Sequence, residues 1–175
     1  MLGTTGSGKT TIARRLATMT GARHIELDAL YWGPNWQPAE AGVFRERIAA
    51  AIEAPRWVID GNYTSMTRDI HWPAADTIVW LDYPFVLVMW RLFRRVMRRS
   101  LSGEELWGGN RERLRTHFLS SDSLFNWARK THWAHRKAWP DYFRRPELAH
   151  VRVVRLRSPR ETERLLREIG ATAQV

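Results

Sequence analysis

The sequence of 175 residues contains no cysteine. The chain therefore has no disulfide framework and no thiolate metal site. Long apolar runs are also missing, since the longest, residues 77–90, is interrupted by Asp82 and Pro84 and is too short to cross a bilayer. The first residues lack the pattern of a secretory signal, and no internal repeat is visible. We therefore expect a soluble, cytoplasmic protein that folds as one domain over residues 1–175.

Lysine is scarce, but arginine is abundant. The formal net charge is +10, from 28 Lys and Arg against 18 Asp and Glu. A guanidinium group can hold a phosphate through two parallel hydrogen bonds. This composition favours phosphate-bearing partners, although it does not identify them.

The most informative segment is residues 3–10, which match the phosphate-binding pattern G-x-x-x-x-G-K-[ST]. Glycines let the backbone curl around a diphosphate, and a helix that begins at Gly8 adds its positive dipole end. Apolar residues at positions 12, 13, 16 and 17 give the helical spacing expected after such a loop. Lys9 should reach the β and γ phosphates, and the Thr10 hydroxyl should ligate Mg²⁺. The predicted nucleotide-binding residues of this segment are Gly3, Thr4, Thr5, Gly6, Ser7, Gly8, Lys9, Thr10 and Thr11. A structural glycine turn is the alternative.

Short apolar runs alternate with helical patterns along most of the chain, which is typical of a parallel sheet covered by helices on both faces. Strands are predicted at 23–27, 57–60, 77–82 and 151–156. Helices are predicted at 39–54, 84–100 and 123–139. A last helix should start with a capping box at Ser158 and close at Gly170. Residues 101–149 break this rhythm, and we interpret them as an insertion over the active site.

Three further marks accompany the loop. They are Leu-Asp-x-x-Tyr-Trp from residue 27, Asp-Gly-Asn-Tyr from residue 60, and Leu-Asp-Tyr-Pro from residue 81 before an arginine-bearing helix. With these marks the chain resembles the adenylate-kinase-like group of P-loop small-molecule kinases, and more narrowly the bacterial set known as adenylate kinases or DNA topology modulation proteins. The resemblance covers most of the chain. It implies a three-layer α/β fold with a parallel five-stranded sheet in the order 2-3-1-4-5, ATP and Mg²⁺ as cofactors, and an arginine-bearing lid within residues 101–149.

Three carboxylates lie at the ends of predicted strands or directly after them. Asp60 precedes a glycine, where a carboxylate can hold Mg²⁺ opposite the loop, although a turn-forming Asp-Gly is the alternative. Asp28 follows a strand whose end faces the acceptor in the kinases that the chain resembles, so it could bind or deprotonate an acceptor hydroxyl. Its alternative role is to cap the next loop. Asp82, just before Pro84, is predicted to cap the following helix.

Aromatic residues come directly after Asp28. Tyr31, Trp32, Asn35 and Trp36 form either a flat pocket for a ring or an apolar cover under a long loop, and the sequence favours neither interpretation.

The helix after Pro84 carries a basic stripe at residues 91, 94, 95, 98 and 99. We predict a solvated face for residues 94, 98 and 99. Arg91 and Arg95 match the two arginines that, in the adenylate kinases it resembles, stack on adenine and clamp phosphate. The resemblance also implies an adenine contact at Ser158, and it makes Arg111 and Arg113 second-line lid candidates. His132 and His135 lack a metal-ligand pattern and are predicted to be ordinary helix residues.

The first functional hypothesis is a kinase that transfers the γ-phosphoryl group of ATP to a small acceptor, with a nucleotide among the candidates. Lys9, Asp28 and Arg95 would be catalytic, and Thr10 and Asp60 would hold the metal. The alternative is a nucleic-acid-binding ATPase of the DNA topology modulation type, which the basic excess and the aromatic residues favour. The concentration of arginines on the predicted lid and helix favours the kinase.

Only Met1 and Leu2 are available for the strand that leads into the loop, although the family order makes this strand the central one. A gap there would leave neighbouring backbone groups unpaired, at roughly 1 to 3 kcal/mol each. We therefore expect a marginal domain whose natural start lies upstream or whose first strand is truncated. About five added apolar residues should raise stability and nucleotide affinity together.

Overall fold

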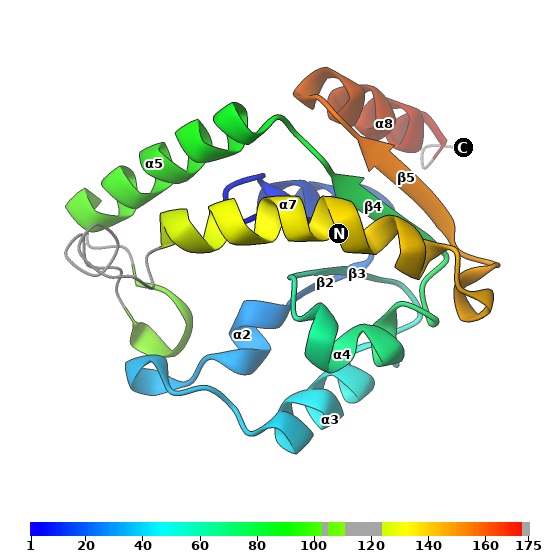
Figure 1. The fold of residues 1–175 in the computed structure, drawn as a ribbon. Coiled ribbons are helices and arrows are strands. Elements are labelled where there is room, and N and C mark those ends of the chain that lie inside the picture. Colours follow the sequence, from blue (N-terminus) through cyan, green and yellow to red (C-terminus); the bar gives the residue numbers. More distant parts are fainter. Residues whose placement is uncertain (103–104, 111–123, 173–175) are drawn as a thin grey trace.

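The computed structural model describes residues 1–102, 105–110 and 124–172, and it is an α/β fold built on parallel strands (Figure 1). The strands are β1 (Leu2–Gly3), β2 (Arg23–Glu26), β3 (Trp57–Asp60), β4 (Thr77–Leu81) and β5 (Arg152–Leu156). The helices are α1 (Lys9–Thr20), α2 (Leu27–Tyr31), α3 (Ala41–Ala51), α4 (Thr64–His71), α5 (Phe85–Ser102), α7 (Leu124–Phe143) and α8 (Pro159–Thr172). Short 3-10 turns are η1 (Pro34–Trp36), η2 (Trp107–Gly109) and η3 (Pro146–Leu148).

The strands pair in two sets. One set has the order β1-β4-β5, the other is β2-β3, and every pair is parallel. β1 is only two residues long, with Leu2 opposite Trp80 and Gly3 opposite Leu81. The amino group of Met1 donates a hydrogen bond to the Ile59 carbonyl oxygen at 2.7 Å and so connects the two sets. The strands are parallel within each set, and no strand pairing joins the two sets in the part of the chain that the structure describes.

Each set of strands has its own apolar cluster. Ile25 and Ile59 of the β2-β3 pair pack with Phe44 and Ile48 of α3. On the other set, Trp80 of β4 meets Trp139 of α7 edge to face, with ring centroids 5.4 Å apart. Figure 1 shows α7 crossing the strands. The second half of α7 therefore belongs to the core, although it lies within the stretch that the sequence marked as an insertion.

Several element bounds differ from those that the sequence predicted. Asp28 lies in the first turn of α2, because this helix begins at Leu27 as soon as β2 ends. The sequence analysis did not predict α4. α7 continues through Pro140, whose missing N–H removes one helical bond, because Trp139 and Phe143 on either side are held in the core.

Gly170 does not close the last helix, which runs on to Thr172. A Cβ atom at Gly170 would lie 2.9 Å from the Met19 methyl group of α1. This glycine therefore allows α8 to approach α1 closely. In the sequence, a glycine with this packing role looks the same as one that ends a helix.

Candidate phosphate-binding site

Residues 3–10 form the loop that leads from β1 into α1, and glycines are required in it for two reasons. Gly6 and Gly8 have φ angles of +85° and +96°, which L side chains rarely adopt. A Cβ atom at Gly6 would also lie 2.8 Å from the Val88 carbonyl oxygen in α5. The loop is therefore held close to the backbone of α5.

The first turn of α1 has no side-chain cap. Gly8 occupies the N-cap position. Because glycine has no side chain, it cannot cap the free N–H groups at the start of the helix. The Ser7 hydroxyl is fully buried, and it has no hydrogen-bond partner among the described residues. This hydroxyl lies beside Gly3 of β1, beneath the loop. The free N–H groups at the helix start fit an anionic group such as a phosphate.

Lys9 is folded back onto the loop. Its ammonium group donates to the carbonyl oxygens of Gly3 at 2.8 Å and Thr4 at 3.4 Å. Burial lowers the pKa of Lys9, while the charges of Asp60 and Asp28 raise it. The lysine thus lies within electrostatic range of both carboxylates that the sequence selected.

The two predicted metal ligands are in contact. The Thr10 hydroxyl donates to Asp60 Oδ1 at 2.9 Å, and Asp60 Oδ2 is 2.8 Å from His24 Nε2. Asp60 is buried at the carboxyl end of β3. Burial, and then the charge of Asp60, raises the pKa of nearby Glu26. His24 was not selected from the sequence, because its register opposite Val58 in the β2-β3 pair is set by the fold.

Two arginines of α5 reach the loop. Arg91 Nη1 donates to the Ser7 carbonyl oxygen at 3.0 Å, and Arg95 Nη2 donates to the Thr5 hydroxyl at 3.3 Å. They are four residues apart and so lie on one face of the helix. Arg94 and Arg98 are exposed, as predicted, whereas Arg99 is partly buried.

Asp28 is held by a tyrosine. The Tyr63 hydroxyl donates to Asp28 Oδ1 at 2.6 Å, and burial, followed by the charge of Asp28, raises the pKa of Tyr63 above its ordinary value. Tyr63 in turn packs against Tyr31 and Phe44. Asp28 is therefore oriented by Tyr63, which is itself packed in the core. The sequence showed Tyr63 only as part of the Asp-Gly-Asn-Tyr segment that begins at Asp60.

Among the aromatic residues after Asp28, Tyr31 lies in the core, and a ring-binding pocket at Trp32 and Trp36 stays a prediction. Tyr31 packs against Phe44 with ring centroids 4.9 Å apart and is part of the core. Trp32 and Trp36 meet edge to face at 5.7 Å, and Trp36 is 36% exposed. Asn110, which sequence analysis did not select, accepts a hydrogen bond from the Trp36 N–H and fixes this loop to the η2 turn.

α7 also touches the glycine-rich loop. His132 Nδ1 lies 3.1 Å from the Thr4 hydroxyl, and both residues are buried. Burial lowers the pKa of His132. The spacing of His132 from His135 gave no signal of this contact, because Thr4 lies 128 positions earlier in the chain.

Asp82 does not have the predicted capping role. Its buried carboxylate accepts from Arg136 Nε of α7 at 2.6 Å and from Arg155 Nη2 of β5 at 2.6 Å. Two guanidinium groups, one partly buried and one exposed, are stronger partners for a carboxylate than the N–H groups at the start of α5. Asp82 therefore joins β4, α7 and β5.

Ser158 forms the predicted capping box. Its hydroxyl accepts from the Glu161 N–H at 3.2 Å and donates to Glu161 Oε1 at 3.1 Å. The adenine contact that the resemblance implies for Ser158 stays a prediction. Arg111 and Arg113 lie outside the described residues.

In a scan of protein families, no family model matches the chain, and no curated protein matches its sequence. Within residues 1–102, 105–110 and 124–172, no helix has both the length and the apolar character needed to cross a membrane.

Proposed function

We propose that the protein is an ATP-dependent kinase in which residues 3–10 are a phosphate-binding loop and the γ-phosphoryl group of ATP is transferred to a small acceptor. The observation that carries the proposal is the contact between Thr10 and Asp60 beside the uncapped start of α1. A hydroxyl and a carboxylate at the edge of an anion site are the protein ligands that a magnesium nucleotide needs.

The proposal includes a sheet in the order 2-3-1-4-5. It is supported by the parallel pairing of β1 with β4 and by the hydrogen bond from Met1 to Ile59 in β3. In an open parallel sheet, ligands bind outside the carboxyl ends of the strands at the point where the order reverses. Asp60 and the glycine-rich loop both follow carboxyl ends of strands in this way.

ATP would supply the transferable phosphoryl group, and Mg²⁺ would neutralise charge on its oxygens. The N–H groups at the start of α1 would bind phosphate, and Lys9 would exchange its carbonyl partners for phosphate oxygens. Thr10 and Asp60 would hold the metal. The described residues contain no group of three or more His, Asp or Glu side chains that could hold a metal ion. The remaining ligands would therefore come from phosphate and water, as Mg²⁺ commonly requires.

Arg91 and Arg95 would neutralise the phosphate chain from the α5 side of the loop, because they already reach Ser7 and Thr5. Asp28 would bind the acceptor hydroxyl. Its Oδ1 atom is occupied by Tyr63, which leaves Oδ2 to accept a proton or a hydrogen bond. The aromatic rings of Trp32 and Trp36 lie on the chain just after Asp28 and would contact a flat acceptor.

An ATP consumption screen against nucleotides, nucleosides and hydroxylated metabolites tests this function. We expect one acceptor class to stimulate turnover and Lys9→Ala to abolish it, since Lys9 contacts the loop and would contact phosphate. Circular dichroism should show that the variant is folded. A Lys9→Ala protein that kept most of its acceptor-stimulated turnover would exclude this loop as the phosphate site.

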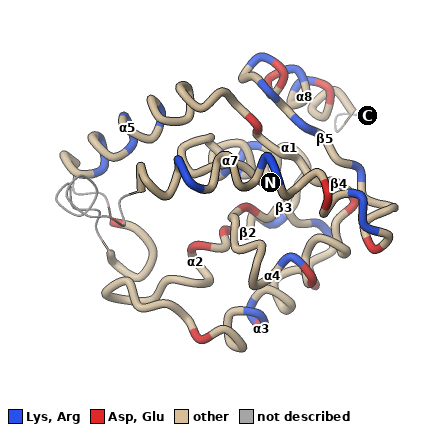
Figure 2. The backbone as a smooth tube through the Cα atoms, in the orientation of Figure 1, with Lys and Arg blue, Asp and Glu red and all other residues tan. Residues whose placement is uncertain are grey.

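A second candidate is a nucleic-acid-binding ATPase, and exposed tryptophans favour it. Trp90, Trp127 and Trp133 are each more than half exposed, at 56%, 58% and 56%. Exposed rings can stack on bases, and arginine and lysine are spread over α5, α7, β5 and α8 (Figure 2). A titration with single-stranded DNA at several salt concentrations tests it, because binding to phosphates weakens steeply with salt. Steep salt dependence without acceptor-stimulated turnover would favour this candidate over the kinase.

A further inference from the structure

α5 has three sides, and contacts with the rest of the chain account for two of them. Leu92 and Val96 are buried and pack with Ala128 of α7. Arg91 and Arg95 reach the glycine-rich loop. Figure 1 shows that α5 lies along the edge of the molecule, so its third side is open to solvent. Nothing in the proposed kinase chemistry uses this third side.

The third side of α5 is apolar over most of the length of the helix. Val86 and Leu101 are 79% and 76% exposed, and Trp90 and Phe93, which lie between them, are exposed as well. Steps of four, three and eight residues place these four side chains on one side of a helix. The Trp90 and Phe93 rings stack with their centroids 6.2 Å apart. We call these four residues the outer stripe of α5. An exposed apolar row of this length is typical of an interaction surface.

α7 continues this surface. The Trp133 ring is more than half exposed, and its centroid lies 6.2 Å from that of Phe85 in the first turn of α5. Arg129 and Lys137 lie one turn before and one turn after Trp133 on the same side of α7, and both are exposed. The outer stripe therefore begins beside a tryptophan that two basic side chains flank.

The charge around the outer stripe has one sign. α5 contains no Asp or Glu, and the exposed Arg94 directly follows Phe93. In α7 the only acidic residue is Asp141, which pairs with Arg144. The partner of this surface should therefore be anionic. A second copy of the chain fits poorly, because contact between two outer stripes would bring the same positive charges together.

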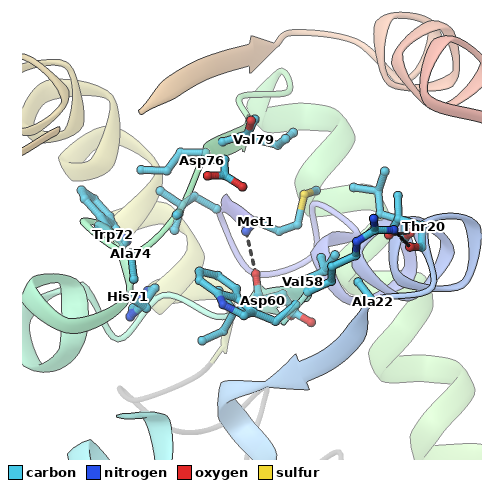
Figure 3. Close-up of a pocket in the computed structure, with 18 of the residues that line it drawn as sticks. Met1, Thr20, Ala22, Val58, Asp60, His71, Trp72, Ala74, Asp76 and Val79 are labelled. Carbon is cyan, nitrogen blue, oxygen red and sulfur yellow. Dashed lines mark hydrogen bonds between the residues drawn. The ribbon is translucent and has the colours of Figure 1, made fainter. Parts of the chain in front are cut away.

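An anionic bilayer fits the outer stripe better than a nucleic acid or an acidic protein does. Val86 and Leu101 are the most exposed members of the stripe, and aliphatic side chains do not stack on bases. The stripe is a ridge on a helix, whereas the cavity of about 740 Å³ beside Met1 is lined by other elements, chiefly β3, β4, α1 and α8 (Figure 3). A protein partner would have to supply a matching groove, but a fluid bilayer adapts to a ridge. Tryptophan, phenylalanine and leucine beside arginine and lysine are typical of helices that lie in a membrane interface.

We propose that the outer stripe of α5 and Trp133 bind the surface of a bilayer that contains anionic lipid. α5 would lie in the plane of the interface, with the stripe at the boundary between headgroups and acyl chains. Arg94, Arg129 and Lys137 would contact lipid phosphates. The arginines that reach the glycine-rich loop lie on another side of α5, so the loop would stay open to ATP while the protein is on the membrane.

Because the chain has no cysteine, one added cysteine can carry an environment-sensitive dye at a single chosen place. Val86→Cys labels the outer stripe, and Val43→Cys labels an exposed valine of α3 as the matched control. With vesicles of phosphatidylcholine and about one third phosphatidylglycerol, the emission of the dye at residue 86 should shift to the blue, because the dye leaves water. The emission at residue 43 should not change. Vesicles of phosphatidylcholine alone should have no effect at either residue.

Vesicle flotation measures what the side chains contribute. Val86→Ser combined with Leu101→Ser should weaken binding to the anionic vesicles by at least about tenfold, because two aliphatic side chains no longer leave water. Arg94→Gln should weaken it by about fivefold, the usual contribution of one basic residue near an anionic surface. Val43→Ser is the control and should bind as the unaltered chain does. Neither assay uses ATP, so the result is independent of the proposed kinase function.

Several results would overturn the proposal. One is failure of the unaltered chain to float with the anionic vesicles, which decides the question even if a variant does not fold. Others are equal emission shifts at residues 86 and 43, or flotation that the double serine variant leaves unchanged. A dimer that the double variant dissociates, seen by light scattering in place of flotation, would assign the surface to a second copy. Binding of single-stranded DNA that is lost in the double variant, without flotation, would assign it to a nucleic acid.

Discussion

At the scale of single residues, the candidate site depends on side chains that hold the reactive groups in place as much as on those groups themselves. Asp60 lies between Thr10 and His24, and Asp28 is oriented by Tyr63. A buried carboxylate with two partners is fixed in direction, because each hydrogen bond removes one of its free orientations. The proposed metal ligand Asp60 is therefore positioned before any ligand binds, whereas the partly buried acceptor ligand Asp28 is oriented by one bond.

Replacement of Arg95 tests whether the α5 arginines stabilise the transferring group. Arg95→Ala should lower kcat by about a hundredfold or more and change the ATP dissociation constant much less, because a clamp tightens as charge develops in the transition state. Lysine at this position should rescue little, for want of the planar guanidinium group. Arg94→Ala, on the exposed side of the same helix, is the matched control and should leave both constants unchanged. Full rescue by lysine would show that any positive charge suffices.

Asp28→Asn removes the negative charge of the proposed acceptor ligand while keeping its shape and its bond from Tyr63. We expect ATP binding to be unchanged and acceptor-stimulated turnover to fall by about a hundredfold, within the usual range for a lost general base. Steady-state kinetics with varied acceptor, beside calorimetric titration with ATP, measure the two effects separately. An unaltered acceptor rate would leave Asp28 with a structural role only.

At the scale of elements, Asp82 joins three segments that are distant in the sequence. Its carboxylate binds Arg136 of α7 and Arg155 of β5 at the end of β4, and Arg155 also lies 4.3 Å over the Trp80 ring. α7 thereby stays against the strands, where His132 can reach Thr4. The position of α7 over the glycine-rich loop thus depends on a carboxylate that lies outside that loop.

Asp82→Ala should therefore destabilise the fold strongly, because it leaves two arginines without their shared buried carboxylate. We expect a loss of about 2 kcal/mol, within the usual range for hydrogen bonds to a charged group, and a thermal midpoint lower by roughly 4 to 8 °C. Asp141→Ala is the control, since its carboxylate pairs with Arg144 on the exposed surface of α7. Similar midpoints for the two variants would show that the Asp82 network adds no net stability.

At the scale of the whole molecule, the interrupted pairing between β3 and β4 makes stability sensitive to pH. The Met1 amine has a pKa of about 6 in the folded chain against 8.0 for an ordinary amino terminus. Its folded pKa is lowered, so the unfolded chain binds more protons between pH 6 and pH 8, and stability rises with pH over this window.

Chemical unfolding at pH 6, 7 and 8 should show a gain of up to about 2 kcal/mol from the lowest to the highest pH, at 1.36 kcal/mol per pKa unit. Acetylation of the amino terminus should remove this gain. It should leave the smaller loss below pH 6.5 that comes from His71, whose pKa is lowered to about 4. A gain of the same size in the acetylated protein would assign the pH dependence to other groups.

The sequence by itself determined those features that are local. The glycines, Lys9 and Thr10 of the loop lie within eight consecutive residues, and the stripe of Arg91 and Arg95 follows from helical spacing, so neither needs long-range information. The strands at 57–60 and 77–82 were visible as apolar runs because both faces of a parallel strand are buried. The sequence selected both Thr10 and Asp60, because a phosphate-binding loop needs a nearby carboxylate to complete a magnesium site.

Only the tertiary structure decided the roles that depend on distant partners. Asp82 had the local pattern of a helix cap, yet Arg136 and Arg155, which lie 54 and 73 residues further along the chain, bind it instead. His132 looked like an ordinary helix residue until the packing of α7 brought it to Thr4. The gap in pairing beside Met1 was visible only in the structure, where β1 is opposite the last two residues of β4 and is not paired with β3. Local sequence patterns predict backbone conformation and burial. The partners of a side chain depend instead on which distant segments the fold brings next to it.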